Sequence, residues 1–83
     1  MYYTYILRSL KDKNNYTGYT DNLQRRFKEH QEGKASATRH RRPLELIYYE
    51  ACLNQQDATQ REKYLKSGRG KQFLKKRLKE YLK

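Results

Sequence analysis

The sequence is poor in the residues that stabilise small proteins by cross-linking or anchor them in membranes. It has one cysteine, one proline, four glycines and no tryptophan among 83 residues. The single cysteine, Cys52, excludes an internal disulfide and a zinc finger, and its apolar neighbours suggest a small side chain in the core. No apolar run approaches the ~18 residues that span a bilayer.

Signals for export or membrane binding are also lacking. The N-terminus, MYYTYILRS, has no basic region before its short apolar run, so it does not resemble a signal peptide. No segment combines a Trp- and Phe-rich apolar face with low overall polarity, which a helix on a membrane surface needs. We therefore expect a cytoplasmic protein with no membrane partner.

Acidic residues are few. The chain has 9 Asp and Glu against 20 Lys and Arg, which gives a formal charge of +11. Such an excess favours a polyanionic partner, because contacts between cations and phosphates release counterions and so strengthen binding. Solubility alone would be a simpler reason for the charge. The predicted partner is nucleic acid, with DNA as the first choice.

Tyrosine is the abundant aromatic residue, with nine rings in the chain. A tyrosine buries a large apolar area while its hydroxyl stays near water, so these rings extend a core that only 35% hydrophobic residues must build. A chain of this length is near the lower limit for a fold without disulfides or structural metal. We expect residues 1–83 to form one domain.

The order of elements predicts an α+β fold. Three segments are typical of strands: 2–8, 15–20 and 44–53. The first two would form a hairpin, and apolar residues on both faces of the third favour a central position in the sheet. Helices are predicted in three further segments: 22–32, 54–67 and about 70–82. The expected architecture is a small antiparallel three-stranded sheet flanked by helices, with residues 34–43 as an exposed loop.

Glu62 is a carboxylate that does not fit its helix. It lies four residues after Ala58 and three before Leu65, which places it on the apolar stripe. A buried carboxylate is costly unless a cation or several donors meet it. A salt bridge to an arginine would satisfy Glu62, and so would a divalent ion, since Mg²⁺ typically takes one or two carboxylates. The spacing does not separate these two interpretations.

The segment YTGYTDNLQRRFKEH, residues 16–30, places reactive side chains around a glycine turn. Asp21 followed by Gln24 has the spacing of a capping box, which starts the first helix. Arg26 and His30 are one helical turn apart, and the strand of Tyr16 ends nearby. A tyrosine, an arginine and a histidine are expected to converge there, although an amphipathic helix with a basic rim would have the same pattern.

This segment resembles the second motif and first helix of the GIY-YIG nuclease superfamily. The resemblance rests on YTG, followed by NL, RF and H at the family spacing within residues 16–30. Glu62, within TQREKYLK, matches the metal-binding acid, and Tyr5 matches the tyrosine of the first motif. The resemblance extends over residues 2–68 and is greatest for small, stand-alone bacterial members. It implies a GIY-YIG-like fold.

The resemblance implies hydrolysis of phosphodiesters with one divalent ion, Mg²⁺ or Mn²⁺. Glu62 would bind the ion, and Arg26 would meet the charge that builds up on the phosphoryl oxygens. Tyr5 and Tyr16 would position or deprotonate the attacking water, and His30 would relay the proton. Which tyrosine acts as the base stays open.

Nucleic-acid contacts are expected from the glycine turn and from two basic clusters. The residues concerned are Gly18, Lys34, Arg39, His40, Arg41, Arg42, Arg69 and Lys71, with Lys75 and Lys76 as an extension. No separate DNA-reading motif is present, so we expect recognition by shape rather than sequence. A partner protein could supply target choice.

Two other functions fit these residues. The first is a non-catalytic nucleic-acid-binding module of the same fold. Tyr3 and Thr4 replace the glycine and isoleucine of the first motif, and no asparagine follows Asn54, where the family often has one. The second is a basic adaptor for an acidic protein, which a strong salt dependence of DNA binding would argue against.

Overall fold

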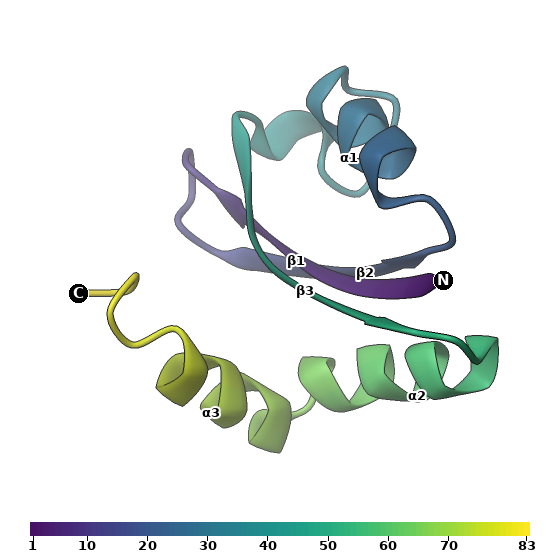
Figure 1. Cartoon of the computed structure of the whole chain (residues 1–83). Coiled ribbons are helices and arrows are strands. Elements are labelled where there is room, and N and C mark those ends of the chain that lie inside the picture. Colours follow the sequence, from purple (N-terminus) through teal and green to yellow (C-terminus); the bar gives the residue numbers. More distant parts are fainter.

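The computed structural model describes residues 1–83 and has the predicted α+β architecture. Its elements are β1 (Tyr2–Ser9), β2 (Asn15–Thr20), α1 (Leu23–Gln31), the 3₁₀ helix η1 (Arg39–Arg41), β3 (Leu44–Cys52), α2 (Gln55–Lys66) and α3 (Gly68–Arg77). The strands form one antiparallel sheet, with α1 over one face and α2 and α3 over the other (Figure 1). None of these helices is long and apolar enough to cross a membrane.

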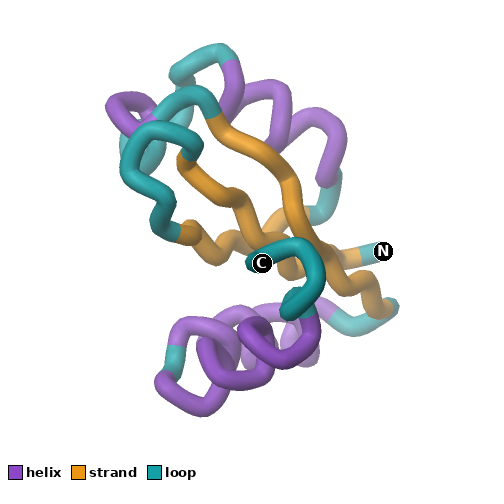
Figure 2. The backbone as a smooth tube through the Cα atoms, turned by 90° about the vertical axis from the view of Figure 1, so that its left-hand side faces the viewer, coloured by secondary structure: helices purple, strands orange, loops and turns teal.

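The sheet has the order β2-β1-β3, so the N-terminal strand lies in the centre. The prediction of a central third strand was therefore wrong. Apolar residues are present on both faces of β3 because helices lie on both sides of the sheet (Figure 2), and residues of β3 join the core on each side. β3 is nonetheless more exposed than β1, and Tyr49 keeps 54% of its surface in solvent.

Two small cores lie on the two faces of β1, because successive side chains of a strand point to opposite sides. Tyr5 and Leu7 pack with Leu44 beneath α1. Ile6, between them in the sequence, packs with Leu65 of α2 and with α3 on the other face. The strand that carries Tyr5 is thus held from both sides.

The first helix begins one residue later than the capping box predicts. Asn22 is its N-cap, and its side-chain oxygen accepts a hydrogen bond from the Arg25 amide at 3.1 Å. The Asp21 carboxylate instead pairs with the Arg25 guanidinium at 3.2 Å. The helix ends before Gly33 as predicted, and Gly33 has a φ of +80°, which favours glycine.

The corner between α2 and α3 differs from the prediction in its details. Gly68 ends the second helix as expected but is already the first residue of α3, and Ser67 caps α3 by accepting from the Gly70 amide at 3.2 Å. The last helix ends at Arg77, and Tyr81 beyond it donates to Glu45 at 2.7 Å. The C-terminal residues therefore fold back on β3 instead of extending the helix.

The segment predicted as an exposed loop, residues 34–43, is anchored in the interior. Ala35 and Thr38 are buried. The Ser9 hydroxyl at the end of β1 donates to the Arg41 carbonyl at 2.6 Å. Thr38 also contacts His30 of α1, so this stretch is tied to that helix, which its composition alone did not indicate. Cys52 is a free thiol and only partly buried, because it is the last residue of the edge strand β3.

Candidate active site

Tyr5 reaches the candidate site by crossing over a glycine of the neighbouring strand. β1 and β2 pair Tyr5 with Gly18, and a methyl group on Gly18 would clash with the Tyr5 ring and hydroxyl. The absence of a side chain at Gly18 therefore makes room for the phenol. Tyr5 is 1% exposed, and burial raises the pKa of Tyr5 to about 12, although nearby Arg26 opposes this rise.

His30, in the last turn of α1, meets this phenol in the interior. The side chain is completely buried, and its Nε2 lies 2.8 Å from the Tyr5 hydroxyl. Burial lowers the pKa of His30 to about 4, with a further decrease from the positive charge of Arg26. The ring is therefore neutral at pH 7. Tyr16 packs against it with ring centroids 5.3 Å apart.

Thr38 is a neighbour of the candidate site that the sequence did not reveal. Its hydroxyl lies 2.6 Å from His30 Nδ1, and the residue is completely buried. A threonine between small and basic residues is common in loops, so no local pattern marked it. Its importance comes from the fold, which brings the segment after α1 against the far side of the His30 ring.

Arg26 lies beside the Tyr5 hydroxyl on the predicted stripe of α1. Its guanidinium is 3.0 Å from the Glu29 carboxylate, and the side chain is 35% exposed. The pKa of Arg26 is raised, chiefly by Glu29 and further by Tyr5. The arginine is thus a fixed positive charge at the border between the buried tyrosine and solvent.

Glu62 lies on α2, which covers the opposite face of the sheet from α1 (Figure 1). Its side chain is 23% exposed, and Lys66 pairs with it at 3.2 Å. Its negative charge makes a minor contribution to the raised pKa of Tyr5, after burial of the phenol and the charge of Tyr16. The ion pair is with a lysine of the same helix and not with an arginine. A carboxylate next to an exposed, displaceable lysine suits a hydrated divalent ion.

The structure contains no group of three or more His, Cys, Asp and Glu side chains that could hold a metal. An ion at Glu62 would therefore have fewer than three such side chains as ligands, with water and substrate oxygens in the other positions. Mg²⁺ is commonly bound in this way, through one or two carboxylates and its own waters.

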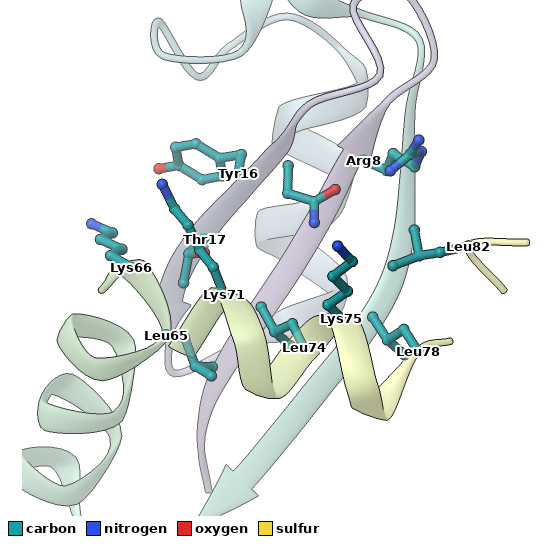
Figure 3. Close-up of a pocket in the computed structure, with 11 residues that line it drawn as sticks. Arg8, Tyr16, Thr17, Leu65, Lys66, Lys71, Leu74, Lys75, Leu78 and Leu82 are labelled. Atoms are coloured by element: carbon teal, nitrogen blue, oxygen red, sulfur yellow. The ribbon is translucent and has the colours of Figure 1, made fainter. Parts of the chain in front are cut away.

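Tyr16 connects this cluster to a groove between the hairpin and α3. The groove has a volume of about 500 Å³. Its floor is formed by leucines of α2, α3 and the C-terminal segment, and Lys71 and Lys75 extend over it (Figure 3). Arg8 and Lys66 add two more cations, and no carboxylate lines the groove. Tyr16 is partly exposed there, unlike Tyr5.

The other predicted nucleic-acid contacts are spread over the surface. Arg39 and His40 are exposed, and Lys34 is paired with Glu32 at 3.2 Å. Arg41 is bound to Asp12 at 2.9 Å, and Arg42 donates to backbone carbonyls, so both hold the loop in place. Two other cations, Arg69 and Lys76, line a different depression of α3 from the one that contains Lys71.

Comparisons with known proteins identify the family to which the chain belongs. Residues 1–76 match the family model described as the GIY-YIG catalytic domain. A UPF0213 protein of Clostridium perfringens is 46% identical over 67 residues, which are 80% of this chain and 71% of that protein. One from Pediococcus acidilactici is 45% identical over 77 residues, covering 89% of this chain and 78% of that protein.

A solved structure supports the same assignment. The solution NMR structure of a UPF0213 protein from Bacillus halodurans matches with a TM-score of 0.54 and 41% identity, over 89% of this chain and 82% of that one. The family model, the relatives and the fold thus lead to one assignment. The chain belongs to the GIY-YIG catalytic domain family, a nuclease family, and within it to the UPF0213 proteins.

Proposed function

We propose that the protein is a metal-dependent endonuclease that hydrolyses phosphodiester bonds of DNA, selected by shape rather than by sequence. The observation that supports this most is the convergence of Tyr5, Arg26 and His30 over Gly18, with the negative charge of Glu62, on the opposite layer of the fold, acting on Tyr5. These residues come from four different elements. A purely structural network would not need a carboxylate and a guanidinium whose charges both act on the same buried phenol.

The two tyrosines have different roles in this proposal. Tyr5 is buried and its pKa is about 12, so it remains protonated at neutral pH and is poorly suited to remove a proton from water. Tyr16 is partly exposed and lines the groove. Tyr16 is therefore the residue that positions or deprotonates the attacking water, and Tyr5 orients its neighbours.

Arg26 and Glu62 would act on the phosphate. The planar guanidinium of Arg26 is held by Glu29 and suits two phosphoryl oxygens, which gain charge in the transition state. Glu62 would exchange Lys66 for a divalent ion, Mg²⁺ or Mn²⁺. GIY-YIG nucleases generally depend on such an ion. When bound, it would polarise the phosphate and stabilise the leaving oxygen.

The groove beside Tyr16 would hold the nucleic acid next to the scissile bond. Its four cations match the charge of a phosphate backbone, and its apolar floor suits sugars or bases. Such contacts carry little sequence information, because phosphates are alike along the strand. The exposed Arg39 and His40 would contribute further phosphate contacts.

The decisive experiment is a titration with Mg²⁺ and Mn²⁺ on linear, branched, flapped and single-stranded DNA. Wild-type protein should nick at least one branched or flapped substrate, and Glu62→Ala, Glu62→Gln and Arg26→Ala should lose this activity while remaining folded. Glu80→Gln is the matched control, because Glu80 pairs with Lys83 on the exposed C-terminal segment. Intact substrates at all metal concentrations would contradict the proposal.

A non-catalytic nucleic-acid-binding module is the second candidate. The burial of Tyr5 and the occupation of Glu62 by Lys66 favour it, since both leave the cluster satisfied without a substrate. This function predicts DNA binding that neither metal nor Glu62→Gln changes. The titration above therefore separates the two.

A further inference from the structure

Three buried polar groups form a chain through the candidate site. The Tyr5 hydroxyl lies 2.8 Å from His30 Nε2, and His30 Nδ1 lies 2.6 Å from the Thr38 hydroxyl. All three residues are at most 1% exposed. The direction of these hydrogen bonds decides which ring nitrogen of His30 carries the proton.

This series of three hydrogen-bonded groups has one donor proton more than it has hydrogen bonds. A tyrosine hydroxyl, a neutral histidine and a threonine hydroxyl supply three protons for two hydrogen bonds. If Tyr5 donates to Nε2, His30 donates from Nδ1 to Thr38, and the Thr38 proton has no acceptor. If Thr38 donates to Nδ1, His30 donates from Nε2 to Tyr5, and the Tyr5 proton is the one left over.

The surroundings of the two hydroxyls favour the second arrangement. The Thr38 hydroxyl has no hydrogen-bond partner other than His30 and is completely buried. A buried donor without an acceptor costs its full desolvation free energy. The Tyr5 hydroxyl also feels the charges of Arg26 and Glu62, on the side of the candidate site. The Arg26 guanidinium can only donate, so a proton left over at Tyr5 would be accepted by the Glu62 carboxylate or by a bound phosphate.

We propose that Thr38 is a positioning residue that donates to His30 Nδ1 and so fixes the tautomer in which Nε2–H donates to the Tyr5 oxygen. In this arrangement His30 does not take the proton of Tyr5. It orients the hydroxyl so that the Tyr5 proton is directed toward the site of the phosphate, which replaces the proton relay expected for His30. The mechanistic part of this inference rests on the proposed nuclease function, whereas the tautomer itself does not.

The other groups around His30 are compatible with a neutral ring. Arg26 and Glu29, on the same helix, act in opposite directions on its pKa, and burial keeps that pKa at about 4. Tyr16, on β2, contacts the ring face. Near pH 7 the proton position on His30 is thus a choice between two neutral tautomers.

The test is ¹⁵N NMR of protein labelled at histidine, near pH 7, where protonated and unprotonated ring nitrogens have well separated shifts. Wild type should show Nε2 protonated and Nδ1 unprotonated for His30, and Thr38→Ser should preserve this signature because it keeps the hydroxyl. Thr38→Val, which is similar in shape, should lose it. A proton on Nδ1 in the wild type, or an unchanged signature in Thr38→Val, would overturn the proposal.

Tyr5→Phe is the complementary variant, and it is informative even if Thr38→Val does not fold. It removes the partner at the other end of the chain, so a tautomer that Thr38 fixes should persist in it. If the proton moves to Nδ1 in Tyr5→Phe, then Tyr5 sets the tautomer and the proposal fails. Because the readout is spectroscopic, a protein that cleaves no DNA would still give an interpretable answer, and the failure of one proposal is distinguishable from that of the other.

Discussion

Gly18 is the residue at which the sheet and the candidate site meet. Its lack of a side chain lets the Tyr5 phenol cross β2 and reach His30 and Arg26. The resemblance assigned Gly18 to close approach of the nucleic-acid backbone. In the structure the group that lies against Gly18 is the ring of Tyr5. The first role of Gly18 is therefore to leave space for that ring.

We expect Gly18→Ala to destabilise the protein by about 1–3 kcal/mol, because the added methyl group would displace the Tyr5 ring in a packed core. The free energy of unfolding from urea titration measures this. Gly68→Ala is the control, since a methyl group there would meet nothing and should leave stability unchanged or slightly higher. Equal stabilities of the two variants would show that Tyr5 does not depend on Gly18.

His30 should make the stability of the fold depend on pH. Its pKa falls from 6.5, the value expected in the unfolded chain, to about 4 in the folded protein. The folded state therefore binds fewer protons than the unfolded state between pH 6.5 and 4. The contribution of the neutral His30 to the free energy of unfolding is fully present above pH 6.5. It should decrease by about 3 kcal/mol as the pH falls to 4, where the folded-state histidine also becomes protonated.

Urea titrations at several pH values measure this loss, and His30→Gln should flatten the curve between pH 6.5 and 4. His40→Gln is the control, because His40 is the other histidine and is exposed. Asp12, whose pKa is lowered to about 2 by Arg41, acts at a lower pH and does not overlap this window. A wild-type curve that is flat above pH 4 would contradict a buried neutral His30.

At the scale of elements, the corner between α2 and α3 keeps Glu62 and the groove in one layer. Ser67 caps α3 immediately after α2 ends, and the backbone of Gly70 packs against the last turn of α2. The floor leucines of the groove, Leu65 and Leu74, lie on either side of this corner. A change at the corner should therefore affect the groove and the fold together.

Gly70→Ala should cost about 3 kcal/mol or unfold the protein, since a methyl group would clash with the Tyr64 carbonyl and the Leu65 backbone, which cannot move as a side chain can. Gly68→Ala, two residues away, is again the matched control. Thermal unfolding followed by circular dichroism measures both. A Gly70→Ala protein as stable as the wild type would show that the two helices are not packed in this way.

At the scale of the whole molecule, some of the 20 Lys and Arg side chains are paired with carboxylates within the protein. Arg61 binds Glu50 at 2.9 Å, and Arg41 binds Asp12. The cations of the groove have fewer partners: Lys71 and Lys75 form no ion pair within the protein. These groove cations are therefore free to meet a phosphate, as are other unpaired Lys and Arg side chains on the surface.

We expect DNA affinity to fall steeply with salt, and each of Lys71→Ala and Lys75→Ala to reduce the slope of log K against log salt by about 1. Lys28→Ala, on the exposed side of α1, should leave the slope unchanged. Fluorescence anisotropy with labelled single-stranded and duplex DNA between low and moderate salt measures this. A weak salt dependence would instead favour the adaptor that binds an acidic protein.

Some of these features could be predicted from local sequence patterns because they depend on nearby residues. The hairpin, the three helices and the stripe that joins Arg26 to His30 follow from short-range periodicity. The edge position of β3 could not be predicted in this way, because apolar residues on both faces of a strand show that both faces are covered and not which strands pair beside it. Thr38 was missed for the same reason: the ring that it contacts belongs to another part of the chain.

The sequence by itself determined the element types, the basic charge and the family, all of which depend on composition and on residues close together in the chain. Only the tertiary structure decided that Tyr5 is sealed over Gly18, that Tyr16 is the tyrosine open to the groove and that Thr38 meets His30. The physical reason is that burial raises or lowers a pKa and fixes hydrogen-bond partners, and burial is created when distant segments pack against one another.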